Sequence, residues 1–216
     1  MDPLRLAIAA VPVAAYLVVV GIVNLRRRPL LASGSADLAA VGIAISGLVF
    51  VGPIELFRPQ AATADLGDAV WVLMLGLYAL PYMLFVLISR PRLVVYNMTA
   101  EQLRPLLAEA VAEVDPDARW AGDSLKLPRL GVQLHLDVFG PMRHTSLVSS
   151  GGDQSLDGWQ RLRKALARAL AGTTVSPHPR GVSLLITAAL LLLASVTRMA
   201  ADPKQVAQAI SDLLSF

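Results

Sequence analysis

The sequence predicts an integral membrane protein with a four-helix transmembrane bundle and a small soluble α+β domain inserted between the third and fourth spans. Two observations predict this fold class. Four apolar stretches are long enough to cross a bilayer, and they bracket one polar segment of roughly ninety residues. The composition agrees, because 55% of the residues are hydrophobic and the mean hydropathy is +0.59. A soluble chain of 216 residues would have little other sequence with which to cover four such helices.

The four spans follow from the length of each apolar run. A hydrocarbon core about 30 Å thick requires about 20 apolar residues in a helix. The first and third runs meet this directly, and the second and fourth meet it if Glu55 and Arg198 lie at the interface. The first run ends in three arginines instead of a small-residue cleavage site, so we expect a retained helix and not a signal peptide. The predicted spans are about 6–25, 38–57, 69–89 and 181–201, so residues 1–89 form the first transmembrane region.

Basic residues at the span ends predict the orientation. Six fall on one side of a four-span protein: Arg26, Arg27, Arg28, Arg90, Arg92 and Arg180. Four fall on the other side: Arg5, Arg58, Arg198 and Lys204. The three consecutive arginines weigh most, because short loops next to spans follow the positive-inside rule best. We therefore expect the soluble domain, residues 90–180, on the cytoplasmic side of a bacterial inner membrane, with both termini outside.

Small residues recur along one stripe of each of the first two spans. The stripes are Ala10, Ala14 and Gly21, followed by Ala39, Gly42 and Ser46. Small side chains let helix backbones approach closely, and this packing drives helix association in a bilayer. We expect contacts within the bundle, and the alternative is a homo-oligomer that forms through the same faces.

Glu55 is the acidic residue nearest to a span interior. It precedes Arg58 by three residues, which places both on one helix face, where they can form an ion pair. An interfacial ion pair is the favoured interpretation. A carboxylate within a span is also a default functional hypothesis, so a proton or cation site is the alternative. The other spans carry little polarity at mid-depth, which disfavours transport.

The soluble segment begins with a strand and a helix. Residues 92–96 are rich in β-forming side chains, which predicts a buried strand. Thr99 and Gln102 have the spacing of a capping box at a helix N-terminus. Apolar residues then recur at helical spacing until Asp115 and the following proline end the helix. This stripe comprises Leu103, Leu106, Leu107, Ala110, Val111 and Val114.

Short strands and a second helix complete the domain. Strand-like pieces cover 118–121 and 124–127. Residues 132–139 alternate strictly between apolar and polar, and a turn then returns the chain through 142–149, which predicts a hairpin. Ser155 caps a helix with a stripe of Trp159, Leu162, Leu166 and Leu170. We predict the order β-α-β-β-β-α, with two helices over one face of the sheet. This order resembles that of small ferredoxin-like domains, a likeness that implies no function.

Asp202 and Pro203 predict a C-terminal helix, because they fit the N-cap and first helical positions. Val206, Ile210, Leu213 and Leu214 form its apolar stripe. We expect residues 202–216 to form an amphipathic helix at the outer membrane surface, with packing against the bundle as the alternative.

Candidate chemistry in the soluble domain is confined to one hairpin. Gln133, His135 and Asp137 share one face of a strand, and His144 lies on the returning strand. His135, Asp137 and His144 are candidate metal ligands, but alternate strand residues lie about 7 Å apart and splay. A solvated sheet face is the favoured interpretation. Neither a nucleophile elbow nor a phosphate loop is present, so we assign no catalytic or cofactor-binding residues and predict no cofactor.

The charge of the soluble segment disfavours nucleic acid as a partner. Residues 90–180 carry 12 Lys plus Arg against 9 Asp plus Glu, a net charge of only +3, and no aromatic stacking platform. Two function classes remain. The favoured one is a non-catalytic membrane protein that presents its domain to a protein partner or lipid surface, as a sensor, adaptor or assembly subunit. The alternative is a small membrane enzyme or transporter that uses Glu55 with Arg58, or His135 with Asp137.

Overall fold

The computed structural model describes the chain except residues 1–2, 55–66, 68, 141–142, 153 and 215–216. The chain forms two compact units, which are described separately below. The first contains Met1–Val20, Leu38–Ile88 and Ser183–Phe216, and the second contains Gly21–Asp37 and Ser89–Val182. The second unit therefore includes a stretch between the first two long helices, in addition to the polar segment that the sequence pattern singled out.

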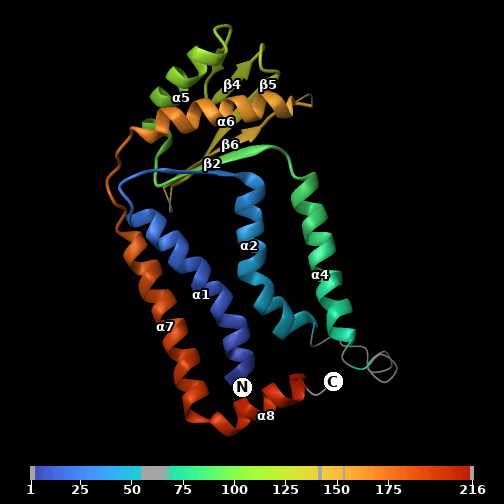
Figure 1. The fold of residues 1–216 in the computed structure, drawn as a ribbon. Helices are drawn as coiled ribbons and strands as arrows, with labels where there is room; N and C mark the ends of the chain where they lie inside the picture. Colours follow the sequence, from blue (N-terminus) through green and yellow to red (C-terminus); the bar gives the residue numbers. More distant parts are fainter. Residues whose placement is uncertain (1–2, 55–66, 68, 141–142, 153, 215–216) are drawn as a thin grey trace. The chain divides into compact units, whose positions relative to one another are not determined.

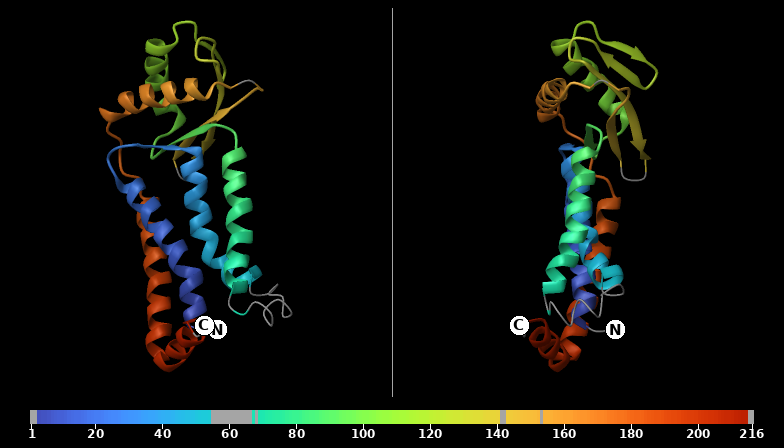
Figure 2. Two further views of the ribbon diagram at one scale, coloured as in Figure 1. Left: turned by 45° about the vertical axis from the view of Figure 1, so that its right-hand side comes forward. Right: turned by 90° about the vertical axis from the view of Figure 1, so that its right-hand side faces the viewer.

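Long apolar helices make up the first unit (Figures 1 and 2). Four helices among the described residues are long and apolar enough to cross a membrane: α1 (Pro3–Leu25), α2 (Gly34–Val49), α4 (Ala69–Ile88) and α7 (Arg180–Ala201). They coincide with the predicted spans, although the second is described only as far as the short π-helical turn η1 (Phe50–Ile54). The predicted C-terminal helix is present as α8 (Pro203–Leu214), and the Gln205 backbone N–H donates to the Asp202 carboxylate at 3.3 Å.

Glycines on α2 allow neighbouring helices of the first unit to approach closely. A Cβ atom on Gly47 would collide with the carbonyl oxygen of Ile8 on α1, and one on Gly42 would collide with the Tyr82 ring on α4. The Tyr82 hydroxyl donates to the Leu38 carbonyl at 2.6 Å. Of the predicted stripe residues, Ala10, Ala14, Gly21 and Gly42 are buried. These positions are thus engaged within the single chain, and a homo-oligomer through them remains a prediction.

The second unit contains a six-stranded antiparallel sheet in the order β1-β2-β6-β5-β4-β3. Its strands are β1 (Leu30–Ser33), β2 (Arg92–Tyr96), β3 (Arg119–Ala121), β4 (Ser124–Leu127), β5 (Val132–Phe139) and β6 (His144–Ser149). The predicted order β-α-β-β-β-α is wrong by two strands, because β1 precedes β2 and four strands, not three, separate the two helices. The ferredoxin-like order has only two there, so that likeness does not hold.

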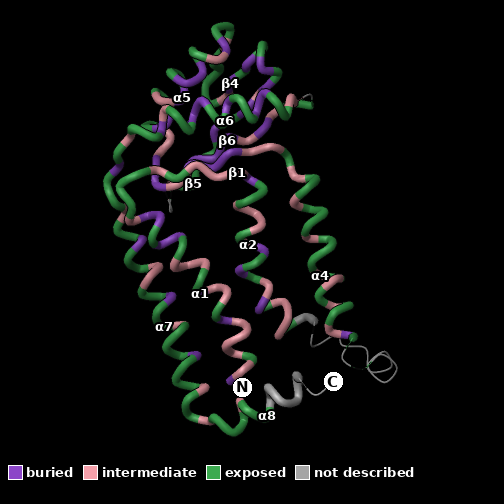
Figure 3. Tube along the Cα trace, in the orientation of Figure 1, coloured by how far each residue is buried: buried purple, intermediate pink, exposed green. Residues whose placement is uncertain are grey.

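Two helices, α5 (Ala100–Val114) and α6 (Leu156–Ala171), supply the apolar side chains that pack on one face of this sheet (Figures 1 and 3). The capping box is confirmed, since Thr99 accepts from the Gln102 backbone and Gln102 accepts from the Thr99 backbone. Apolar side chains alternate inward along β5 as predicted. The fully buried centre of this core includes Leu103, Leu107, Leu125, Leu127, Leu134, Leu147, Leu162 and Leu166, all at 0% exposure.

The edge strand β1 was not predicted from the sequence. It begins five residues after α1 ends and runs directly into α2, and its register places Leu31 opposite Val95 and Ser33 opposite Leu93. Nearby, the Asn97 side-chain amide donates to the Arg26 carbonyl at 2.7 Å. The chain therefore connects the sheet directly to α1, α2 and α4, while a short segment joins α6 to α7.

Candidate functional site

The sheet face opposite α5 and α6 holds a charged contact that links the first turn of α2 to β2. The Arg92 guanidinium donates to the Asp37 carboxylate at 2.6 Å, and the Tyr96 hydroxyl donates to the other oxygen of the same carboxylate. The Asp37 side chain is only 14% exposed, so this pair is largely withdrawn from solvent. We call Asp37, Arg92 and Tyr96 the β2 clamp.

The local sequence explains how the clamp forms. Arg92 and Tyr96 stand two pleats apart on one face of β2 and bind both oxygens of Asp37, so the carboxylate lies over the intervening Val94, which is 1% exposed. A Cβ atom on Gly34 would collide with the Arg92 side chain, so glycine lets that side chain cross the start of α2. An acidic residue in the first turn also complements the helix dipole.

Beside the clamp, three rings form a row across neighbouring strands. The register pairs His144 on β6 with Phe139 on β5, and places it next to Tyr96 on β2. The His144 ring centroid lies 5.1 Å from that of Phe139 and 5.6 Å from that of Tyr96. We call Tyr96, His144 and Phe139 the aromatic row.

His144 favours its neutral form in this setting. Burial is the largest cause that lowers its pKa below the ordinary value of 6.5, and the nearby Arg92 lowers it further, while Asp37 and Asp137 act in the opposite direction. Its Nδ1 atom is buried without a hydrogen-bond partner among the described residues. A neutral imidazole between two aromatic rings is a packing element more than an acid or base.

The predicted metal ligands do not converge. His135 faces Val148, Asp137 faces Ser146, and His144 faces Phe139, so no two of the three form a cross-strand pair. Among the described residues, no group of three or more His, Cys, Asp or Glu side chains could hold a metal ion. The structure instead brings the Ser124 hydroxyl to 3.2 Å from His135 Nδ1, a contact that the sequence pattern did not suggest.

That Ser–His contact lacks the rest of a catalytic site. The exposed Asp137 stands on the next outward position of the same strand as His135, about 7 Å along the sheet, and cannot orient the imidazole from there. The contact itself is exposed to solvent. The other predicted pair, Glu55 with Arg58, lies outside the described residues.

A basic surface covers the solvent side of α6. Arg161, Arg163, Lys164 and Arg168 are all exposed, and none forms an ion pair within the part of the chain that the structure describes. The buried stripe of Trp159, Leu162, Leu166 and Leu170 fixes the opposite side of the helix on the sheet. We call these four cations the α6 basic face.

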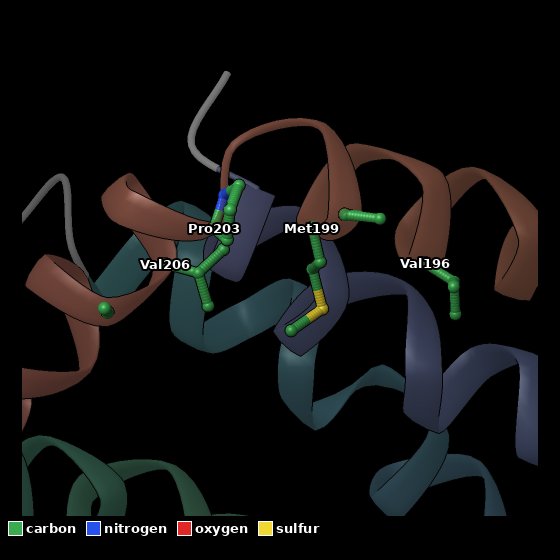
Figure 4. A pocket seen from close by; sticks show the side chains of 6 residues that line it. Val196, Met199, Pro203 and Val206 are labelled. Carbon is green, nitrogen blue, oxygen red and sulfur yellow. The ribbon is translucent and has the colours of Figure 1, made fainter.

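The first unit contains an apolar hollow where α7 meets α8 (Figure 4). It is lined by Val196, Met199, Ala200, Pro203, Val206 and Ala207. Without convergent polar groups in this lining, the hollow offers packing space for an aliphatic chain but no chemistry.

Comparisons with models of known protein families, with curated proteins and with solved structures found no match. The function is therefore argued from the site alone.

Proposed function

We propose that this chain is a multi-pass protein of the cell membrane, without catalytic activity, that presents its α+β unit on the cytoplasmic side to an acidic protein partner. It would act as an adaptor, sensor or assembly subunit. The observation that carries this proposal is the α6 basic face, whose four cations have no intramolecular partner among the described residues. Complementary charge on a partner would steer its approach and fix its register.

The polar groups on the other face of the sheet support the same interpretation. Asp37, Arg92 and Tyr96 contact one another, and His144 lies between the rings of Tyr96 and Phe139. These residues stabilise the junction between β1, β2 and α2. The α6 basic face takes no part in these contacts.

The predicted orientation places this surface where a cytoplasmic partner can reach it. The three arginines after α1, the two around the start of β2 and Arg180 all adjoin the second unit in the sequence, as the positive-inside rule requires of a cytoplasmic segment. Lipid headgroups are the alternative occupant of the basic face, and the following experiment separates the two.

A photo-crosslinking amino acid at the exposed Gln160 tests the proposal in native membranes. We expect a discrete protein adduct that is lost when Arg161, Lys164 and Arg168 are all changed to Glu. The matched control changes Arg119 and Lys126, exposed cations on β3 and β4, to Glu and should keep the adduct. Crosslinks to lipid alone, or a protein adduct that survives the charge reversal on α6, would contradict the proposal.

The alternative class, a small membrane enzyme or transporter, is favoured by one contact, between Ser124 and His135. A hydrolase that used it would lose activity toward an activated ester in both Ser124→Ala and His135→Gln. A transporter that used the Glu55–Arg58 pair would lose proton-linked flux in Glu55→Gln. We expect neither activity in the purified chain reconstituted in liposomes.

A further inference from the structure

The free end of the β5–β6 hairpin exposes apolar side chains on both faces of the sheet. Along β5 the inward positions are buried as far as Leu136, but Val138, the next inward position, is 52% exposed. Phe139, on the opposite face, is 48% exposed although it stacks on His144. We call Val138 and Phe139 the hairpin tip.

Hydrogen bonds place the hairpin tip at the end of the second unit where the chain arrives from α1 and leaves for α7. The Met98 backbone N–H donates to the carbonyl of Arg143, the residue that precedes β6, at 2.8 Å. The neighbouring Asn97 amide donates to the Arg26 carbonyl. The Arg143 guanidinium in turn donates to the Ser176 carbonyl at 3.2 Å, which ties the hairpin to the segment before α7.

The two chain connections also lie side by side at this end. The Val175 backbone N–H donates to the Arg27 carbonyl at 2.9 Å, and the His178 backbone N–H donates to the Asn24 carbonyl at 2.8 Å. Asn24 belongs to the last turn of α1, a helix apolar enough to cross a membrane. If α1 and α7 span the bilayer, as proposed above, the surface of the bilayer must lie at this end of the second unit.

The charge around the hairpin tip matches that surface. Arg26, Arg27 and Arg28 are exposed in the segment that Asn97 and Val175 bind, and among the described residues Arg143 contacts Gln102 and Ser176 but no acidic group. Apolar side chains with flanking arginines suit the boundary between headgroups and acyl chains, where the apolar group meets the acyl chains and the cation meets phosphate.

We propose that the hairpin tip inserts into the interface of the same bilayer that holds the spanning helices, and that its occupant is lipid. This inference rests on the proposed membrane placement. It gives the exposed Val138 and Phe139 an apolar environment, and it fixes the second unit to the membrane surface at a point separate from its covalent connections.

The chain contains no cysteine, so single spin labels can be placed without background. Separate Val138→Cys and Phe139→Cys variants of the full chain carry a nitroxide in nanodiscs with anionic lipid. Collisions with oxygen, which concentrates in lipid, are compared with collisions with a water-soluble nickel chelate. We expect oxygen to dominate at both positions. The matched control, His135→Cys on the exposed face of the same strand, should favour nickel.

Leu80→Cys on α4, where the side chain is 70% exposed, reports on the proposed membrane placement itself. If collisions with oxygen dominate at position 80 while collisions with nickel dominate at both 138 and 139, the inference about the hairpin tip is overturned and the proposed membrane placement stands. Nickel dominance at 80 would overturn the placement. Low collision rates with both reagents at 138 and 139 would indicate burial against protein and would also overturn the inference. Because a label at 139 removes a stacked ring, the label at 138 keeps the test valid if that variant misfolds.

Discussion

The two units of this chain bury different kinds of residue. In the second unit the large leucines, such as Leu134 and Leu147, are fully buried. In the first unit large side chains such as Leu80 and Leu87 are 70% exposed, whereas small ones such as Ala14 are buried. Burial of large apolar groups drives folding in water, but in lipid only close packing of small residues distinguishes the inside of a bundle from the outside.

This contrast shows that the two units present different kinds of side chain at their surfaces. The second unit has a buried apolar core between its sheet and the helices α5 and α6. The first unit exposes large leucines, and its helices make close contacts at positions such as Gly42 and Gly47. The β2 clamp lies at the start of α2, where the chain passes from the second unit into the first.

The largest expected effect comes from the same truncation in each unit. Leu147→Ala removes a fully buried side chain from the central strand β6 and should cost about 2–5 kcal/mol of the free energy of unfolding. Leu80→Ala removes an exposed side chain from α4 and should change it by no more than about 0.5 kcal/mol. Hydrogen exchange of the full chain in nanodiscs measures both. Equal losses would show that α4 is buried against protein and not lipid.

The next largest effect should come from the β2 clamp. Asp37→Asn leaves Arg92 without its counter-charge in a partly buried site, and we expect a loss of roughly 1–2 kcal/mol. The loss should be local, seen as faster exchange of the β1 and β2 amides with β4 unchanged. A matched control, Asp123→Asn, breaks an exposed pair with Arg104 and should cost less than about 1 kcal/mol. An unchanged β1 in Asp37→Asn would mean that the pair does not hold the edge strand.

The smallest effect should be on the pH dependence of the stability of the second unit. Because burial lowers the pKa of His144, the unfolded chain binds this proton more readily than the folded one. The second unit should therefore lose stability as the pH falls below about 6.5, the ordinary histidine value, and His144→Gln should reduce this loss. His178, whose burial also lowers its pKa, acts with the same sign, so His178→Gln is measured in parallel. A steeper loss in His144→Gln would contradict this assignment.

Patterns that are local in sequence predicted much of this fold. The apolar runs, the Thr99–Gln102 capping box and the alternation along 132–139 each report on neighbours within one element. The strand β1 could not be found this way, because Leu30–Ser33 is too short to alternate and its partner strand lies about sixty residues later. The β2 clamp depends on that pairing and so was also missed.

The site residues show the same limit. The types and spacing of His135, Asp137 and His144 suggested metal ligands, but the register between β5 and β6 decides which side chains meet. It pairs His144 with Phe139 and leaves His135 beside Ser124 on β4. Register depends on the turn between the strands, and a period-2 pattern alone does not specify it to the residue.

Cysteine accessibility across α7 tests the central claim, that the apolar helices span a membrane with the α+β unit on the cytoplasmic side. Single Lys164→Cys and Lys204→Cys variants lie on α6 and α8, which precede and follow α7 in the chain. A membrane-impermeant maleimide added to intact cells should label position 204 at once and position 164 only after permeabilisation. Labelling of both in intact cells, or of neither before permeabilisation, would contradict a spanning α7 and with it the proposed topology.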